Sequence, residues 1–275
     1  MPQAPVAVSL ESLNSISPEK VSLENVERVA YRSQPENHVL GASDKDRLGV
    51  ERFKLLRYRL YRLRQQRTVK SVLITSAIPK EGKTTVAANL AVTLAQASER
   101  VLLADADLRK PSLHSLFGLT PAEGLAGHLQ GRVELLGSLR RVDPLGFFFL
   151  GAGRSPANPV ELLQGEAMRN AVKNTATVFD WVVIDSPPIL PLADGRFLAS
   201  LCDAVIVVVR EEYTRQEDLR ELMAALKGTN LAGIVLNGSN SVKKRSYAYY
   251  SSTAPTGNIS PLTGCLTKQP ARGRA

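Results

Sequence analysis

Cysteine, aromatic side chains and long apolar runs are all scarce in this sequence. Two cysteines in 275 residues, Cys202 and Cys265, are too few for a disulfide framework or a cysteine metal site. Aromatic residues make up only 5% of the chain, so Val, Leu, Ala and Ile must fill the core, which is typical of a buried parallel sheet. The longest apolar runs, at residues 145–153 and 203–209, are too short to cross a bilayer, and the first residues lack the features of a signal peptide. The sequence therefore predicts a cytoplasmic protein.

Hydrophobic periodicity divides the chain into three parts. Residues 1–44 are rich in Ser, Pro, Glu and Asn without a sustained period, and we expect a disordered leader there. A helical spacing begins near Asp46, and short apolar runs then alternate with helical stretches as far as Asn240. The apolar runs are residues 71–76, 101–105, 147–151, 181–185, 204–209 and 233–238, and the helical stretches are residues 83–97, 158–172 and 215–228. This alternation predicts an α/β domain over residues 45–240, with a mainly parallel β-sheet flanked by helices on both faces, and a flexible tail over residues 241–275.

Positive charge is concentrated at two places in a chain of net charge +9. Residues 45–70 hold ten basic and two acidic side chains, and residues 238–275 hold six basic and no acidic ones. Such segments meet nucleic acid, an anionic membrane surface or an acidic partner, or they are simply solvated faces that favour solubility. Composition leaves these alternatives open.

The stretch TSAIPKEGKTT, residues 75–85, lies between the first apolar run of the domain and the first long helical stretch. It fits the phosphate-binding loop G-x-x-x-x-G-K-[ST], except that Ala77 replaces the first glycine. In such a loop, backbone N–H groups at a helix N-terminus hold phosphate oxygens, Lys83 reaches the β- and γ-phosphates, and the Thr84 hydroxyl binds Mg²⁺. The predicted nucleotide-binding residues are Lys80, Glu81, Gly82, Lys83, Thr84 and Thr85.

Three carboxylates follow other apolar runs. Asp105 and Asp107 come at the end of residues 101–105, and Asp185 ends residues 181–185. Because ligands of open α/β sheets bind at the carboxyl ends of the strands, we expect these acids near the phosphate loop, as Mg²⁺ ligands or as a base for an attacking hydroxyl or water. The alternative for Asp107 is a helix cap with Arg109 as its ion-pair partner.

These motifs, in this order and spacing, resemble the bacterial tyrosine kinases of capsule and exopolysaccharide export, which are relatives of the MinD/ParA-type P-loop ATPases. The similar stretches are residues 75–91, 101–119 and 181–188. The resemblance implies a P-loop NTPase fold and ATP-dependent tyrosine kinase activity with Mg²⁺. It places Lys83 and Thr84 on phosphate and Mg²⁺, Asp105 and Asp107 at the metal and the reacting hydroxyl, and Asp185 in the Mg²⁺ site. Thr84, Asp105 and Asp185 are thus the expected metal ligands, and the catalytic set is Lys83, Asp105, Asp107 and Asp185.

Three further positions bear on this resemblance. Asn237, at the end of the last apolar run, is expected to face the adenine as in related ATPases. Lys80 stands where the family usually has glycine. Ile78 occupies the place of the signature lysine of MinD/ParA proteins, which argues against that subclass.

The tail stretch KKRSYAYYSS, residues 243–252, holds three of the seven tyrosines of the chain. Beside an ATP site, Tyr247, Tyr249 and Tyr250 are predicted phosphoacceptors on a flexible tether. From Asn237 to Tyr247 an extended chain spans roughly 35 Å, enough to enter a neighbouring subunit. Each phosphate adds about −1.5 to −2 charge beside the basic residues of the tail, which predicts a looser assembly after phosphorylation.

The resemblance also implies partners. Glu51, Lys54 and Arg57 match an oligomerisation motif of the family, Glu-x-x-Arg/Lys-x-x-Arg, and predict a ring-like homo-oligomer; the alternative is a solvated face with an intrahelical Glu51–Lys54 pair. Because family members need a transmembrane partner, we expect a separate membrane activator, or co-polymerase, that holds this chain at the inner face of the plasma membrane. A protein tyrosine phosphatase is a further expected partner, and no specific nucleic acid is expected.

Three functions remain to be distinguished. The first is a tyrosine autokinase that phosphorylates its own C-terminal tyrosines in trans between subunits and regulates exopolysaccharide or capsule polymerisation and export. The second is a ParA/MinD-like positioning ATPase, which the missing lysine and the tyrosine tail disfavour. The third is a nucleotide-switched scaffold without catalysis, which the intact lysine and carboxylates disfavour.

Overall fold

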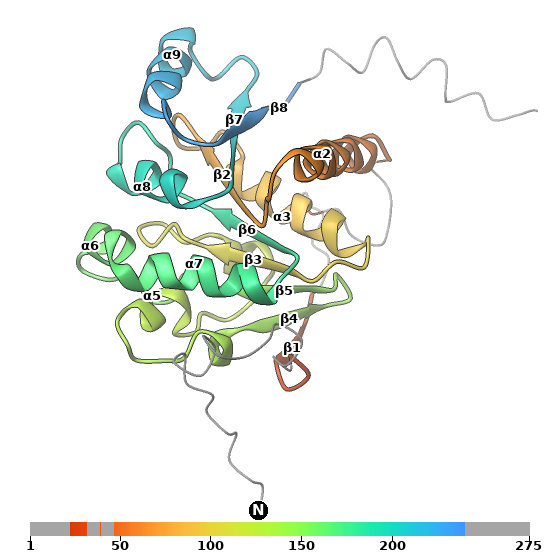
Figure 1. The fold of residues 1–275 in the computed structure, drawn as a ribbon, viewed down its shortest axis with the longest axis vertical. Helices are drawn as coiled ribbons and strands as arrows, with labels where there is room; N and C mark the ends of the chain where they lie inside the picture. The colour runs from red at the N-terminus through yellow and green to blue at the C-terminus, as the bar shows by residue number, and fades with distance from the viewer. Residues whose placement is uncertain (1–22, 32–38, 40–46, 240–275) are drawn as a thin grey trace, which may run out of the picture. The chain divides into compact units, whose positions relative to one another are not determined.

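The computed structural model describes residues 23–31, 39 and 47–239, and a single β-sheet runs through them (Figure 1). Its eight strands lie in the order β1-β4-β5-β3-β6-β2-β7-β8. Their bounds are β1 Glu27–Ala30, β2 Ser71–Ser76, β3 Val101–Asp105, β4 Arg140–Asp143, β5 Phe147–Leu150, β6 Trp181–Asp185, β7 Ala204–Arg210 and β8 Leu231–Asn237. All neighbours pair in parallel except β4 and β5, which are antiparallel. The predicted mainly parallel sheet is confirmed.

Helices cover both faces of this sheet, as predicted. Their bounds are α2 Arg47–Gln66, α3 Lys83–Ala95, α4 Leu113–Leu116, α5 Gly124–Leu129, α6 Pro159–Gln164, α7 Glu166–Val178, α8 Ala193–Leu201 and α9 Gln216–Ala225, with a short 3₁₀ turn at Leu136–Ser138. Successive strand residues point to opposite faces, so Val72 and Ile74 pack with α2 and α3, whereas Leu73 packs on the other side with α5 to α9 (Figure 1). Every residue of β2 and β6 is buried, which explains why both strands carry apolar side chains on both faces.

The structure corrects the expectation of a disordered leader over residues 1–44. Within this range, β1 pairs in parallel with β4, and the next residue, Tyr31, is buried with its ring 5.9 Å from that of Phe117. The short apolar pair Val29 and Tyr31 therefore joins the core that the aromatic residues of β5 also form. Residues 1–22, 32–38 and 40–44 of the predicted leader, and the predicted tail over 241–275, lie outside the described residues.

Two further elements differ from expectation. The predicted helical stretch over residues 158–172 is two helices, because Gly165 has an extended backbone (φ −65°, ψ 162°) that ends α6 before α7 begins. The strand β4 was not predicted, since its sequence RRVD carries three charged residues. No helix within the described ranges is both long enough and apolar enough to span a bilayer.

Candidate nucleotide site

The phosphate loop joins the carboxyl end of β2 to the N-terminus of α3, as the sequence predicts. Gly82 precedes α3 in the left-handed region (φ 92°), which favours glycine. A Cβ atom there would also lie 2.1 Å from Nδ2 of Asn237, so a larger residue would displace that side chain. Lys80 has a positive φ of 68° as well. The loop thus turns tightly enough to present backbone N–H groups at the start of a 13-residue helix, which is the geometry that binds phosphate.

Side chains from β7, β8 and the loop after β7 donate hydrogen bonds to the phosphate loop. Glu81 is fully buried; its carboxylate accepts the N–H of Ile78 at 2.8 Å and the hydroxyl of Thr214. Asn237 Nδ2 donates to the Glu81 carbonyl at 3.0 Å, and Arg210 Nη1 donates to the Lys80 carbonyl at 3.1 Å. Glu81 therefore contributes to this site by fixing the loop, since its carboxylate points into the protein.

Sequence reasoning missed Thr214 and Arg210. Both lie at or just beyond the carboxyl end of β7, the strand beside β2. That position was the available signal, because residues following a strand next to the phosphate loop are well placed to contact it.

Strand pairing brings the predicted carboxylates together. Asp105 is opposite Asp185 in the register of β3 and β6, and Ile74 of β2 is also opposite Asp185. On the neighbouring loop, Asp107 Oδ2 lies 3.7 Å from Nζ of Lys83, with only 6% and 14% of these side chains exposed. The lysine of the phosphate loop and all three acids therefore meet at one edge of the sheet.

The hydrogen bonds of Asp105 and Asp107 give the two residues different tasks. Asp105 accepts three backbone N–H groups, from Asp107, Ser112 and Leu113, each at 3.1 Å. Asp107 accepts one, from Lys110 at 3.0 Å, and keeps its second oxygen toward Lys83. Asp105 thus organises the loop, whereas Asp107 presents a carboxylate oxygen to the site.

Asp185 carries the least satisfied carboxylate of this group. It is fully buried, and neither oxygen accepts a hydrogen bond of ordinary geometry within the described residues. Burial raises the pKa of Asp185, and the Lys83 ammonium and the nearby Thr84 hydroxyl oppose this rise. Burial, followed by repulsion from Asp185, raises the pKa of Asp105. A cation would relieve both effects.

The donor set fits Mg²⁺, a hard cation that prefers oxygen ligands. The oxygen donors at this site are the Asp185 carboxylate, Oδ1 of Asp105, which accepts a single N–H, and the Thr84 hydroxyl, which lies 3.3 Å from the Ser112 hydroxyl. In the part of the chain that the structure describes, no group of three or more His, Cys, Asp or Glu forms a complete metal site.

Other predicted residues lie as follows. Thr85 is in the first turn of α3, half-buried. On α2, Glu51 and Lys54 form the intrahelical ion pair at 2.8 Å, whereas Arg57 Nη1 donates to the Thr93 carbonyl of α3 at 2.7 Å. The acceptor candidates Tyr247, Tyr249 and Tyr250 lie outside the described residues.

The proposed ion pair between Asp107 and Arg109 is wrong. Arg109 Nε instead donates to Oδ2 of Asp194, in the first turn of α8, at 2.6 Å. Asp194 lies too far along the chain for a local pattern to reveal it.

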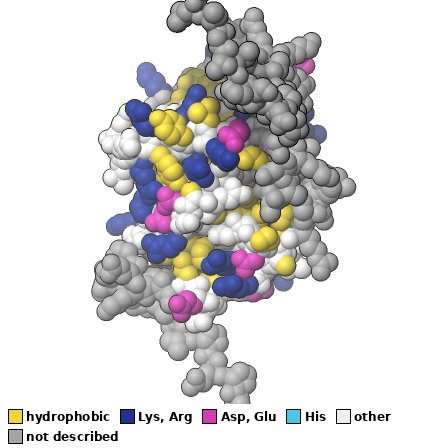
Figure 2. Space-filling model, turned by 90° about the vertical axis from the view of Figure 1, so that its right-hand side faces the viewer, with side chains coloured by type: hydrophobic (Ala, Val, Ile, Leu, Met, Phe, Trp, Pro, Cys, Tyr) yellow, Lys and Arg dark blue, Asp and Glu magenta, His cyan; other side chains and the backbone are white. Residues whose placement is uncertain are grey.

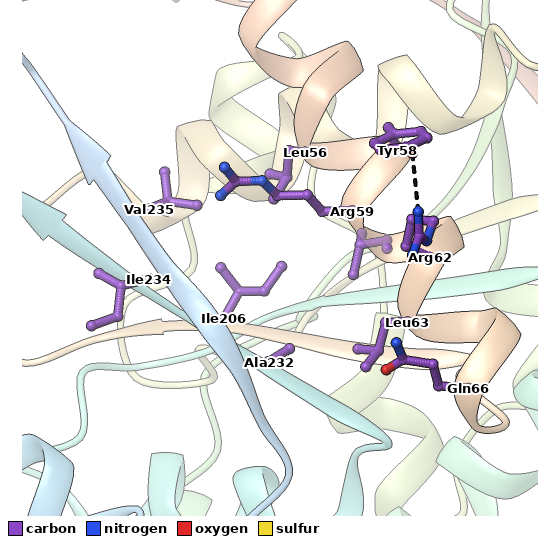
Figure 3. Close-up of a pocket in the computed structure, with 12 residues that line it drawn as sticks. Leu56, Tyr58, Arg59, Arg62, Leu63, Gln66, Ile206, Ala232, Ile234 and Val235 are labelled. Carbon is purple, nitrogen blue, oxygen red and sulfur yellow. Dashed lines mark hydrogen bonds between the residues drawn. The ribbon is translucent and has the colours of Figure 1, made fainter.

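A pocket of about 450 Å³ lies away from the phosphate loop, between α2 and the sheet edge at β8 (Figure 3). Leu56, Leu63 and Ile206 give it an apolar wall, and Arg59 and Arg62 are basic residues at its helix side. Arg62 donates to the Tyr58 hydroxyl at 3.4 Å, as the dashed line in Figure 3 marks. The pocket is lined neither by the phosphate loop nor by a carboxylate, so it is a feature of the surface apart from the nucleotide site.

The side of the molecule that bears α2 shows many basic side chains, together with apolar side chains and fewer acidic ones (Figure 2).

Comparison with known proteins agrees with this geometry. Residues 72–256 match the model of the CobQ/CobB/MinD/ParA nucleotide-binding domain family. The chain is 34% identical over 221 residues to the tyrosine-protein kinase YwqD of Bacillus subtilis, a match that covers 79% of this chain and 93% of that protein. It is 32% identical to the tyrosine-protein kinase Etk of Escherichia coli K12 over 73% of this chain, but spans only 28% of that longer protein.

Two solved structures are similar. The kinase domain of E. coli Etk gives a TM-score of 0.67 at 32% identity, covering 69% of this chain and 75% of that one. The chimeric protein CapA2B2 gives a TM-score of 0.68 at 29% identity, covering 75% and 91%. With the phosphate loop, the strand-end carboxylates and these matches, the chain belongs to the bacterial tyrosine kinases within the CobQ/CobB/MinD/ParA family of nucleotide-binding domains.

Proposed function

We propose that this kinase uses Mg-ATP to phosphorylate Tyr247, Tyr249 and Tyr250 on a neighbouring copy of itself. The observation that supports this best is the meeting of Lys83, Asp107 and the buried Asp185 carboxylate, which accepts no hydrogen bond of ordinary geometry within the described residues, at the carboxyl ends of the strands. Asn237, the last residue of β8, donates its side-chain amide to the phosphate loop, and Tyr247 follows ten residues later.

The chemistry is a phosphoryl transfer. Lys83 and the N–H groups at the start of α3 bind the phosphates, which replace Asp107 as the partner of the lysine. The tyrosine oxygen attacks the γ-phosphorus, the bond from that phosphorus to the β–γ bridging oxygen breaks, and ADP leaves. Asp107 accepts the tyrosine proton, since its oxygen faces the site while those of Asp105 are bonded to the backbone.

Thr84, Asp105 and Asp185 would hold the Mg²⁺ ion, which neutralises phosphate charge when bound. The chain itself contributes the burial of Asp105, Asp107 and Asp185, which strengthens the interactions of these charges.

At the cellular level, we place the protein at the inner face of the plasma membrane, where it regulates exopolysaccharide or capsule polymerisation and export. A separate transmembrane activator recruits it, and a tyrosine phosphatase reverses the modification. The similarity to a chimeric protein, CapA2B2, supports action together with a second polypeptide. Membrane fractionation with and without the activator checks the recruitment; an equal distribution contradicts it.

Mass spectrometry tests the activity. After incubation with Mg-ATP and the cytoplasmic segment of the activator, we expect phosphate on the tail tyrosines of the wild type and none in Lys83→Met. An unmodified wild-type tail, or equal modification in both proteins, contradicts the kinase proposal.

A mixing experiment tests transfer between copies. Lys83→Met, which keeps its tyrosines, is combined with an active chain whose Tyr247, Tyr249 and Tyr250 are replaced by Phe. Phosphate appearing on the Lys83→Met chain, at a rate that rises with the concentration of the active chain, is the expected result. Modification that occurs only within wild-type chains, independent of concentration, means transfer in cis.

A further inference from the structure

The segment that follows β6, residues 186–194, connects the three motifs of the site. Its first part pairs with β2 and the phosphate loop: the Ser186 N–H donates to the Ile74 carbonyl at 3.2 Å, and the Ile189 N–H donates to the Ser76 carbonyl at 2.9 Å. The Leu190 N–H donates to the Ala77 carbonyl at 3.2 Å, inside the phosphate loop itself. We call residues 186–194 the strap.

The strap ends at Asp194, a carboxylate in an unusual position. It is fully buried, and its Oδ2 accepts Arg109 Nε at 2.6 Å, while Oδ1 has no hydrogen-bond partner among the residues that the structure describes. Removing one member of a buried pair leaves an uncompensated charge, so a carboxylate with one partner depends strongly on that partner. Arg109 is therefore firmly held by α8.

Arg109 belongs to the loop that carries Asp107. The Leu108 carbonyl of this loop accepts the Ser155 hydroxyl at 2.9 Å from one side, and the Arg109–Asp194 pair holds the loop from the other. Asp107, two residues before Arg109, is thereby kept 3.7 Å from Lys83. The strap thus joins the phosphate loop to the Asp107 loop through one ion pair.

We propose that Arg109 and Asp194 are positioning residues for phosphoryl transfer, which set the place of Asp107 relative to the phosphate loop. The proposal rests on the kinase activity proposed above, but not on which tyrosines accept the phosphate. Arg109 keeps 37% of its side chain exposed, so its loss removes little core packing. A misplacement of about 1 Å in a reacting group costs roughly a hundredfold in rate, so the effect should appear in turnover.

The test compares Arg109→Gln and Asp194→Asn, alone and together, with a control on the same helix as Asp194. Arg196→Gln serves as that control, because Arg196 is exposed on α8. We expect each single variant to lower kcat at least about tenfold, with KM for ATP changed less than about threefold. The kcat of the double variant should be no lower than that of the less active single variant. Arg109→Lys should restore part of the rate, since it keeps the charge.

Asp107→Asn separates positioning from general damage. If Arg109 acts through Asp107, adding Arg109→Gln to Asp107→Asn lowers the rate no further. A further drop by the same factor as in the wild-type background overturns the proposal, as does a normal kcat in both Arg109→Gln and Asp194→Asn.

Hydrogen exchange tests the positioning role of Arg109 and Asp194 when a variant is too unstable, or the wild type too inactive, for kinetics. We expect faster exchange over residues 106–113 in Arg109→Gln than in wild type or Arg196→Gln. Unchanged exchange over residues 106–113 contradicts the proposal that Arg109 and Asp194 hold the Asp107 loop in place. A wild type without kinase activity refutes the proposed function separately.

Discussion

Asp105 and Asp185 show how one pair of residues links the sheet to its chemistry. Parallel pairing sets them opposite each other at the ends of β3 and β6, where both are fully buried. Burial raises the pKa of each, because desolvation disfavours the charged form of a carboxylate. The site therefore gains stability from a cation and loses it without one.

Asp185→Asn should stabilise the metal-free protein at pH 8. The folded-state pKa of Asp185 is above its ordinary value of 3.8, so the folded state holds a proton more tightly than the unfolded state. The ionised group is thus destabilising at high pH, and this cost disappears as the pH falls toward the unfolded pKa. We expect a gain of about 1–3 kcal/mol in the free energy of unfolding at pH 8, because a neutral amide replaces a buried carboxylate whose ionisation is unfavourable in the folded state.

Urea denaturation in EDTA between pH 8 and pH 4.5 measures this gain. It should shrink steadily toward the acid end. A gain of equal size at every pH means that shape, and not charge, is responsible.

At the scale of elements, Thr214 in the loop after β7 tests how the phosphate loop is held. Thr214→Val leaves one oxygen of the buried Glu81 carboxylate without its donor. The penalty of about 1–3 kcal/mol should loosen the loop and raise KM for ATP about three- to tenfold. Thr177→Val, at an exposed site on α7, is the matched control. Steady-state kinetics with equal KM in both variants contradicts this role.

β1 offers a second test at this scale, since it attaches the N-terminal part to the sheet. Tyr31→Ala should lower the free energy of unfolding by about 3 kcal/mol, as large aromatic truncations in cores do. Tyr31→Phe should be neutral or stabilising, because the buried Tyr31 hydroxyl has no hydrogen-bond partner within the described residues. Thermal and urea denaturation check both, with Tyr58→Ala, which is 55% exposed, as control. Equal effects of Tyr31→Ala and Tyr58→Ala mean that β1 does not contribute.

The sequence predicts those elements whose burial is visible in their own residues. β2 and β6 carry apolar side chains on both faces because helices cover both faces of the sheet, and the roles of Lys83 and Thr84 follow from the local spacing of the phosphate loop. The strand β4 could not be predicted, because Arg140 and Arg141 interrupt the apolar pattern of this strand near the sheet edge. The role of Asp194 could not be predicted, because its partner Arg109 is 85 residues away in the sequence and only folding brings the two together.

For the whole molecule, the question is how copies assemble. Glu51 and Lys54 are exposed, and their ion pair is worth only a few tenths of a kcal/mol to the helix. Arg57 differs, since it also ties α2 to α3 through the Thr93 carbonyl. The same three-residue motif thus serves two purposes if a ring forms.

Light scattering and thermal denaturation separate these purposes. Glu51→Ala should reduce the assembly with little change in melting temperature, whereas Arg57→Ala should reduce the assembly and lower the melting temperature by a few degrees, as a loss of about 1 kcal/mol does. Arg52→Ala, on an exposed part of α2, should do neither. If Glu51→Ala and Arg57→Ala both assemble as the wild type does, the ring interface lies elsewhere.

The strand order has a consequence for biosynthesis. β2, which leads into the phosphate loop, pairs only with β6 and β7, and Ser71 is bonded to Asp203, 132 residues later. At about 5–20 residues per second, a ribosome needs roughly 7–26 seconds to make that intervening chain. Until β6 emerges, β2 has no neighbouring strand to pair with, and the many residues of β2 and α3 that are buried in the folded protein lack that part of their packing. We therefore expect chaperones to bind the nascent chain until β7 has emerged. The chain should acquire its affinity for nucleotide late in synthesis.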